Sequence, residues 1–438
     1  MKKKILSIIL TAVMTFGVLS ACGQTAGNNG STADNNSDTN AEVTTETSVE
    51  ATSEASSSDS TDASSVESSS AEAEVTAENA VVVKGITERS DEMRDISAKE
   101  LVAEMTAGWN LGNTLEATGG EGLSSETSWG NPKITKEMID TVCEKGFDSI
   151  RIPITWGNHV SEAPDYTIDP EWMDRIEEVV NYALDDGMYV LIDTHHEEFW
   201  RIPDDEHIEA VDAENIALWK QIAERFKDYG DHLVFEGLNE PRTKGSAGEW
   251  TGGTHEERVL VNRLNKSFVD TVRATGGNNE KRLLLITTYA GANMPEVLND
   301  LEVPEDEHIG VAIHAYEPYN FTFENSGDGD YNTWDGSHNG DIIKLMTRLE
   351  TTFIKNDIPV LLTEYGAMNK KENTEEVVKW AEAYVSRATE RGIPCFWWDN
   401  GIYTQQGEKF AILDRKNLKW YREEVVDTII RESYKDKN

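Results

Sequence analysis

The sequence predicts an α/β protein with a closed (β/α)₈ (TIM) barrel, preceded by a disordered acidic Ser/Thr-rich linker. Between residues 89 and 438, apolar runs alternate with amphipathic segments eight times. The apolar runs are nearly continuous, as expected for parallel strands that helices cover on the outside. Polar residues collect after the strands. A doubly wound open sheet gives a similar alternation, but the count and the polar strand ends favour a closed barrel.

Residues 1–21 are predicted to be a secretory signal peptide with a lipobox. Lys2–Lys4 supply positive charge, and the apolar run Ile5–Leu19 is shorter than the roughly 20 residues that span a bilayer. Leu19-Ser20-Ala21-Cys22 resembles a bacterial lipobox, in which the Cys is lipid-modified. We therefore expect lipidation of Cys22. The protein would then lie on the extracellular face of a bacterial envelope, anchored only through this lipid, or be secreted.

Residues 22–88 are predicted to be a disordered acidic tether. Ser, Thr, Ala, Asn, Glu and Asp dominate this segment, and no Lys or Arg occurs in it before Lys84. It cannot bury enough apolar surface to offset the entropy of ordering, and its negative charges repel one another. The folded barrel domain is therefore assigned to residues 89–438.

The composition excludes some classes of partner. Lys and Arg number 40 against 81 Asp and Glu, for a net charge of −41. Nucleic acids and anionic membrane surfaces carry the same sign and would be repelled, whereas a neutral polysaccharide is indifferent to it. With 3 Cys, a disulfide framework is not expected. Cys143 and Cys395 are expected to be small buried residues, and a bridge between them is left open.

The predicted elements follow from periodicity and end signals. In one helix, Trp172, Ile176 and Val179 recur at helical spacing; Asp212 is predicted to cap another, and Gly276-Gly277 to end a third. The predicted strands are Trp109–Thr114, Ser149–Trp156, Tyr189–Thr194, Leu233–Leu238, Leu283–Thr288, Ile309–Tyr316, Pro359–Glu364 and Cys395–Trp398. The predicted helices are Thr135–Lys145, Glu171–Asp185, Ala213–Tyr229, Glu256–Ala274, Pro295–Asn299, Asp341–Lys355, Glu375–Arg391 and Leu418–Ser433.

Six of the strands carry polar residues that converge on one rim of the barrel, where barrel active sites lie. Two of these residues, Glu240 and Glu364, are carboxylic acids that directly follow apolar runs. Paired carboxylates suit the cleavage of a glycosidic bond, because one protonates the leaving oxygen while the other attacks. The alternative is that one Glu is a structural ion-pair partner of Arg151.

Residues 105–425 resemble glycoside hydrolase family 5, particularly its bacterial endoglucanases. Asn-Glu-Pro alone is shared by several barrel families, but the ordered set of motifs is specific. The matching stretches are Gly108–Thr114, Trp129–Pro132, Phe147–Trp156, His195-His196, Asn239-Glu240-Pro241, His314-Ala315-Tyr316, Glu364-Tyr365-Gly366 and Trp398.

The resemblance implies a retaining endo-β-1,4-glucanase (cellulase) that hydrolyses internal bonds of plant cell-wall β-glucans by double displacement. Glu240 would be the general acid/base and Glu364 the nucleophile. The resemblance also implies supporting residues: Asn239 on the sugar 2-hydroxyl, Arg151 and Tyr316 beside Glu364 to keep it ionised, His195 and His314 on sugar hydroxyls or beside the acid/base, Trp398 as the stacking floor, and Asn110 and His196 as further contacts.

Physical chemistry adds expectations for the two acids. A retaining pair has carboxyl groups roughly 5–5.5 Å apart. The pKa of Glu240 should be raised by the negative charge of Glu364.

Several tryptophans are assigned by their predicted location. Those in rim loops either stack on sugar faces or pack the loops: Trp129, Trp200, Trp250 and Trp334. Trp219 and Trp380 lie in predicted helices and should be core, and Trp397 should face away from Trp398.

Neither a metal nor another cofactor is expected. Asp193, His195 and His196 are ligand types, but adjacent strand residues point to opposite faces, which disfavours a metal-dependent amidohydrolase-like barrel. Two alternatives stay open: the same mechanism on xyloglucan, mixed-linkage glucan, mannan or xylan, and a surface glycan-binding lipoprotein without catalysis. The expected partner is a β-glucan, and the expected state is a monomer.

Overall fold

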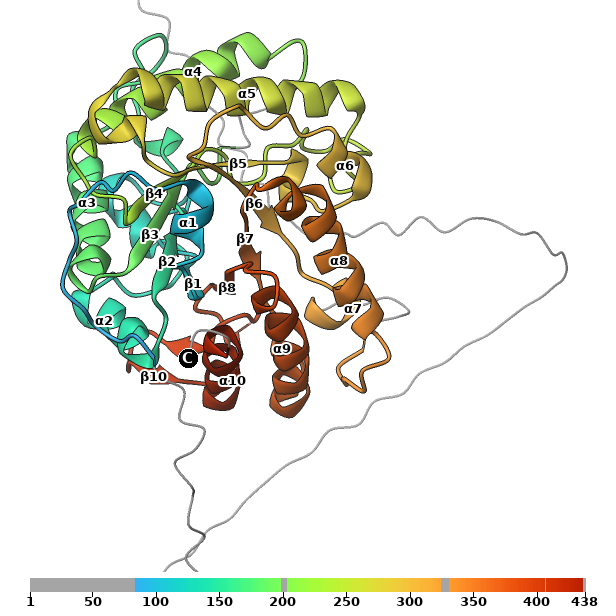
Figure 1. Ribbon diagram of the computed structural model, residues 1–438. Helices are drawn as coiled ribbons and strands as arrows, with labels where there is room; N and C mark the ends of the chain where they lie inside the picture. The colour runs from blue at the N-terminus through green and yellow to red at the C-terminus, as the bar shows by residue number, and fades with distance from the viewer. Residues whose placement is uncertain (1–82, 198–202, 324–330, 406, 436–438) are drawn as a thin grey trace, which may run out of the picture. The chain divides into compact units, whose positions relative to one another are not determined.

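The computed structural model describes residues 83–197, 203–323, 331–405 and 407–435. Within these residues eight parallel strands close into a barrel in chain order, with β1 also paired to β8 (Figure 1). The strands are β1 Ala107–Leu111, β2 Ser149–Ile152, β3 Tyr189–Asp193, β4 Leu233–Glu236, β5 Leu284–Thr287, β6 Ile309–His314, β7 Val360–Tyr365 and β8 Cys395–Asp399. The predicted (β/α)₈ barrel is confirmed. The predicted signal peptide, Cys22 and the tether up to residue 82 lie outside the described residues.

Helices surround the barrel and short 3₁₀ turns join several of the elements (Figure 1). The α-helices are α1 Ala98–Val102, α2 Lys136–Lys145, α3 Pro170–Asp185, α4 Ile208–Arg225, α5 His255–Ala274, α6 Pro295–Asn299, α7 Tyr319–Thr322, α8 Asn339–Thr352, α9 Thr374–Thr389 and α10 Glu423–Tyr434. The 3₁₀ turns are η2 Gly122–Thr127, η3 Gly157–His159, η4 Gly277–Glu280, η5 Tyr289–Gly291 and η6 Ile354–Asn356. Each predicted helix has a counterpart. No helix in the described ranges is both long and apolar enough to cross a membrane.

The predicted start of α4 is wrong. The helix begins at Ile208, so Asp212 lies inside it and accepts a hydrogen bond from Arg263 at 3.0 Å instead of capping it. The N-cap is His207, whose side chain makes no capping hydrogen bond, so no side chain takes the role that was predicted for Asp212. The Asp204 carboxylate accepts from the backbone N–H of Glu206 and of His207 in the turn that precedes the helix.

The predicted start of α10 is also wrong. Leu418 has a φ of +52°, which a right-handed helix does not allow. The chain forms a hairpin there, with β9 Leu413–Asp414 antiparallel to β10 Lys419–Trp420, and the Trp420 ring packs 6.0 Å from Phe147. The helix begins only at Glu423.

The N-terminal half of the barrel interior is filled with apolar side chains. A cluster of buried residues from alternate strand positions forms this core: Tyr189, Leu191, Val234, Leu283, Leu285, Ala312, Leu361 and Phe396. Ala98, Leu101 and Val102 of α1 belong to the same cluster, so this short helix closes the bottom of the barrel. The polar strand residues are therefore confined to the other end, as is usual for this fold.

The expected core residues lie where predicted. Trp219 and Trp380 have no exposed surface, and Trp397 packs 6.2 Å from the Trp380 ring of α9, away from the barrel interior. Cys143 and Cys395 are buried and unpaired, so the bridge that had been left open between them does not form. Thr87, in the last part of the predicted tether, donates its backbone N–H to Asp186 at 3.0 Å.

Arg282, just before β5, joins several loops at the bottom of the barrel. It is fully buried and donates to Asn279 and to four backbone carbonyls, those of Phe226, Tyr229, Gly230 and Leu233. The guanidinium thus links the end of α4, the loop before β4 and the start of β4 through one buried donor group.

We expect Arg282→Met to lower the free energy of unfolding by about 3–5 kcal/mol, because the hydrogen bonds of a buried guanidinium to Asn279 and to four carbonyls are lost together. Urea unfolding followed by circular dichroism measures this. The control is Arg431→Met on the exposed side of α10, where a change within about 0.5 kcal/mol is expected. Equal stability of the two variants would contradict the role of Arg282.

Candidate active site

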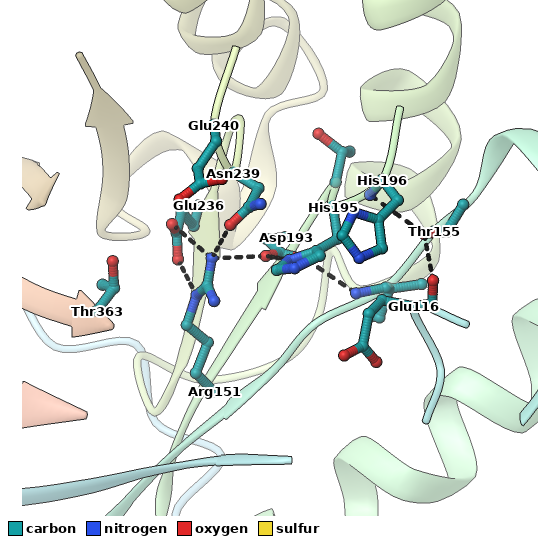
Figure 2. A network of polar contacts seen from close by, with 12 residues as sticks. Glu116, Arg151, Thr155, Asp193, His195, His196, Glu236, Asn239, Glu240 and Thr363 are labelled. Atoms are coloured by element: carbon teal, nitrogen blue, oxygen red, sulfur yellow. Dashed lines mark hydrogen bonds and ion pairs between the residues drawn. The ribbon is translucent and has the colours of Figure 1, made fainter. Parts of the chain in front are cut away.

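The polar end of the barrel is organised around Arg151 of β2, a fully buried guanidinium. Figure 2 shows it between Asp193, Glu236 and Asn239. Its Nε and Nη2 donate to the two carboxylate oxygens of Glu236 at 2.6 and 3.0 Å, and Nη2 also lies 2.8 Å from Asn239 Oδ1 and 2.7 Å from Asp193 Oδ2. Nη1 donates to Glu364 Oε1 at 2.8 Å. One cation thus contacts three buried carboxyl groups.

Glu364 of β7 has both carboxylate oxygens engaged. Oε1 accepts from Arg151, and Oε2 accepts from the Tyr316 hydroxyl at 2.9 Å. Its side chain is only 7% exposed, so these two donors set its orientation. The expectation that Arg151 and Tyr316 lie beside Glu364 is met by these contacts. The pKa of Tyr316 is raised well above its usual value, by burial first and then by the charge of Glu364.

Glu240 lies across from Glu364, with His314 of β6 between them. His314 Nδ1 is 2.8 Å from Glu240 Oε1 and 3.5 Å from Glu364 Oε2. One oxygen of each carboxylate and one nitrogen of the imidazole lie within 4.8 Å of one another. The second oxygen of Glu240, Oε2, is 3.5 Å from Arg242. The two acids thus face each other across one histidine.

The expected pKa of Glu240 is wrong. Burial favours its neutral form, but the hydrogen bond and charge of His314, with the charge of Arg242, outweigh burial and lower the pKa to about 2. Burial lowers the pKa of His314, but the charges of Glu364 and Glu240 overcome this and raise it. The contact between the two side chains therefore favours an ionised Glu240 and a protonated His314. Sequence reasoning considered only the like charge of Glu364 and left out the cation between the two acids.

A layer of rings lies next to the acids. The His195 ring is parallel to that of Trp398 within 2°, with centroids 5.9 Å apart, and its Nδ1 is 2.7 Å from Asp193 Oδ2. His196 stands edge-on to His195 at 4.6 Å, with Trp129 5.5 Å beyond it. Trp398 packs with Met368 and Phe410 and is 8% exposed.

The remaining predicted residues are held as supports. Asn110 donates from Nδ2 to the backbone carbonyl of Thr363 at 2.9 Å and accepts from Arg151 at 3.2 Å, so it braces β7 next to Glu364 from inside the barrel. Its 0% exposure excludes direct sugar contact. Asn239 shares the Arg151 contact but is 4% exposed at the rim. All the predicted site residues with described positions come together at this one end.

Sequence reasoning missed Glu236. It lies on β4 with both oxygens on Arg151, and burial raises its pKa against the opposing charge of Arg151. The available signal was an acid inside the apolar run Leu233–Leu238, which needs a buried cation as a partner. Asp193 was considered only as a metal ligand, but its Oδ2 is shared by Arg151 and His195.

The rim tryptophans divide into two kinds. Trp129 and Trp250 are 39% and 55% exposed, whereas Trp334 is 5% exposed and packs 5.0 Å from Phe321. For Trp334 the loop-packing alternative is therefore correct. Trp200 lies outside the described residues.

The family follows from comparison with known proteins. Residues 113–404 match the family model described as Cellulase (glycosyl hydrolase family 5). The chain belongs to glycosyl hydrolase family 5. This family 5 enzyme is therefore a glycoside hydrolase, and the resemblance seen in the sequence motifs is confirmed at the level of the family.

Relatives of this family 5 enzyme cover most of its length. Endoglucanase A of Ruminococcus albus is 61% identical over 343 residues, 78% of this chain and 94% of that protein. Endoglucanase B of Ruminococcus albus is 45% identical over 428 residues, 97% of this chain and 96% of that protein.

Solved structures of this family also match the chain. A xyloglucan-specific endo-β-1,4-glucanase from a metagenomic library, in complex with cellotriose, is 50% identical with a TM-score of 0.74, covering 76% of this chain and 98% of that chain. A broad-specificity endoglucanase from Ruminococcus champanellensis with bound cellotriose is 41% identical with a TM-score of 0.75, covering 77% of this chain and 99% of that chain.

We expect His314 to carry both ring protons at pH values above 6.5, the usual pKa of histidine. The charges of Glu364 and Glu240 raise its pKa, although burial lowers it. Glu240→Gln should lower the pKa of His314, since one of the two charges is lost. NMR of ¹⁵N-histidine-labelled protein measures both.

The internal control is His195, whose pKa is lowered well below 6.5 by burial and then by the charges of His196 and Arg151. Its ring should stay neutral from pH 6 to 8 in both proteins. A His314 titration below pH 6.5, or one that Glu240→Gln does not move, would refute the placement of the proton.

Proposed function

We propose that this enzyme is a retaining endo-β-1,4-glucanase that cleaves internal bonds of β-glucans by double displacement. The observation that carries the proposal is the single histidine that reaches both acids, at 2.8 and 3.5 Å, with the nearest carboxylate oxygens within 4.8 Å. Retaining enzymes hold their carboxyl groups about 5–5.5 Å apart, whereas inverting enzymes need about 6.5–9.5 Å to admit a water. The close pair supports the retaining mechanism.

Glu364 is the proposed nucleophile. Arg151 and Tyr316 bind its two oxygens, which fixes the direction of attack on the anomeric carbon. The C–O bond to the leaving sugar breaks as the Glu364–carbon bond forms. The glycosyl-enzyme is then hydrolysed by a water, which restores Glu364.

Glu240 is the proposed acid/base, and it works as a pair with His314. The pair holds one proton along its 2.8 Å hydrogen bond. When a sugar covers the site, this proton passes through Glu240 to the departing glycosidic oxygen. In the second step Glu240 takes a proton from the attacking water and returns it to the pair.

Other residues of the site position the sugar. Asn239 uses its Oδ1 to accept from Arg151, so its amide N–H₂ is the group directed to the sugar 2-hydroxyl. Trp398 and the parallel His195 ring form a flat surface beside the acids. A Cβ at Gly112 would lie 2.8 Å from the Trp398 ring, so only glycine there lets the strand lie this close to the floor.

A β-1,4-glucan is the substrate that the relatives favour. The names of those relatives include two endoglucanases, a xyloglucan-specific endo-β-1,4-glucanase and a broad-specificity endoglucanase. Xyloglucan is the second candidate because the xyloglucan-specific enzyme is 50% identical to this chain.

We expect reducing-sugar release from carboxymethylcellulose, mixed-linkage glucan and xyloglucan, with a drop of at least about 10⁴-fold in Glu364→Ala. A panel that also contains mannan and xylan ranks the substrates by rate.

In glycosidase variants that lack one carboxylate, azide can take its place. Glu364→Ala with azide and an aryl β-cellobioside should therefore give the α-glycosyl azide, and Glu240→Ala the β-glycosyl azide.

The two azide products assign the two acids separately. The same anomer from both variants, or full activity of Glu364→Ala on any polymer of the panel, would contradict the proposed roles. A wild-type protein that binds these polymers without releasing sugar would favour a glycan-binding lipoprotein instead.

We further propose that residues 1–21 are cleaved and that Cys22 carries a lipid. The support is the charged start, the short apolar run and the small residues before Cys22. Expression with radiolabelled palmitate in a bacterial host should label the wild-type protein and not Cys22→Ser. Equal labelling of the two would count against the anchor.

A further inference from the structure

The loop after β4 presents an exposed tryptophan on a fixed support. Trp250 is 55% exposed, and the guanidinium of Arg242 lies over its ring at 4.2 Å from the centroid. A cation over an indole face is a favourable contact that holds the ring in place. With Arg242 on one face, so large an exposed fraction requires the rest of the ring to face solvent.

The loop itself is tied down. Arg242 Nε pairs with Glu249 at 3.2 Å, and the other oxygen of Glu249 accepts from the backbone N–H of Gly245 at 2.8 Å. Thr243 donates its backbone N–H to the Tyr289 hydroxyl at 3.0 Å. The ring of Trp250 is therefore displayed by a braced loop.

The same guanidinium reaches Glu240. Arg242 Nη1 donates to the Glu240 carbonyl at 3.0 Å and lies 3.5 Å from its carboxylate Oε2. The other carboxylate oxygen, Oε1, faces His314. Arg242 and Trp250 therefore lie on the side of the Glu240 carboxyl that is turned away from His314 and Glu364.

The position of Arg242 and Trp250 relative to the two acids indicates which part of the substrate they would meet. Glu364 attacks the anomeric carbon, so the sugar that forms the glycosyl-enzyme lies on the Glu364 side. Glu240 delivers its proton to the leaving oxygen, so the sugar that departs lies beyond Glu240. A β-linked glucose unit has equatorial hydroxyls and apolar C–H faces, which match the flat face of an indole.

We propose that Trp250, held by Arg242, binds the sugar on the leaving-group side of the scissile bond. Arg242 is a positioning residue that acts through Trp250 and Glu240. This inference rests on the proposed hydrolase function and adds to it the surface that receives the departing chain. The same surface would accept an incoming sugar when the glycosyl-enzyme is transferred to a saccharide instead of water.

Loop packing does not explain Trp250. Trp334, also in a rim loop, packs on Phe321 and is 5% exposed, as expected for a tryptophan that stabilises its loop. Trp250 leaves more than half of its surface in water. That is an unfavourable position for a large apolar side chain without a ligand.

The test uses two substrates that differ only in the leaving group. Cellotetraose places a sugar on the leaving-group side, whereas β-cellobiosyl fluoride leaves as fluoride, with no ring to bind. Trp250→Leu keeps an apolar side chain and loses the flat face, and Trp250→Phe keeps a flat face. We expect Trp250→Leu to reduce kcat/KM at least tenfold more on cellotetraose than on the fluoride, and Trp250→Phe to recover most of this.

The pH dependence of kcat/KM in Arg242 variants provides a second test. A positive charge 3.5 Å from Glu240 favours loss of the proton from the acid pair, so its removal should move the basic limb of the kcat/KM profile to higher pH. Arg242→Gln should show this shift together with a partial loss of discrimination between the two substrates, and Arg242→Lys a smaller shift. An unmoved profile in Arg242→Gln would refute the positioning role.

The outcomes separate the two proposals. A wild-type protein that hydrolyses neither substrate overturns the proposed function and this inference with it. A wild-type protein that hydrolyses both, with Trp250→Leu affecting them equally or not at all, overturns only the inference. A selective loss on cellotetraose, with less transfer to added cellobiose, supports it.

Discussion

The arrangement of the site depends on the burial of one cation, Arg151, among three carboxyl groups. An uncompensated buried charge costs several kcal/mol, so each of these groups must stay in contact with the guanidinium. Glu236 pairs with Nε and Nη2 of Arg151, Asp193 pairs with Nη2, and Glu364 pairs with Nη1. Since these residues come from β2, β3, β4 and β7, the contacts fix the rim geometry of half the barrel. Asp193 also orients His195, which lies parallel to Trp398.

The second constraint is the proton between the two acids. Two carboxylates that face each other would ordinarily share a proton because they cannot both ionise at low cost. Here His314 lies between the two acids, and its hydrogen bond to Glu240 lowers the pKa of that carboxyl while the two carboxylates raise the pKa of His314. In the proposed mechanism, the catalytic proton is shared along the hydrogen bond between His314 and Glu240. Arg242 on the far oxygen of Glu240 adds to the same balance.

The barrel and most of the site could be predicted from the sequence, because strand periodicity and strand-end motifs are local signals. Glu240, Glu364, Arg151, Tyr316 and Trp398 come together as expected. What failed depended on contacts distant in sequence. Helix α4 begins before Asp212, with His207 as its N-cap, and a φ of +52° at Leu418 delays the start of α10. The pKa of Glu240 and the pairing of Glu236 with Arg151 required side-chain distances, which periodicity does not contain.

The stereochemistry of the first product tests the central claim most directly. Proton NMR of cellotetraose hydrolysis, recorded within the first minutes before mutarotation, reports which anomer of cellobiose is released. The close pair formed by Glu240 and Glu364 predicts the β-anomer, which then decays to the equilibrium mixture. Initial release of the α-anomer would mean that water, not Glu364, attacks the anomeric carbon. The account of the two acids would then be wrong.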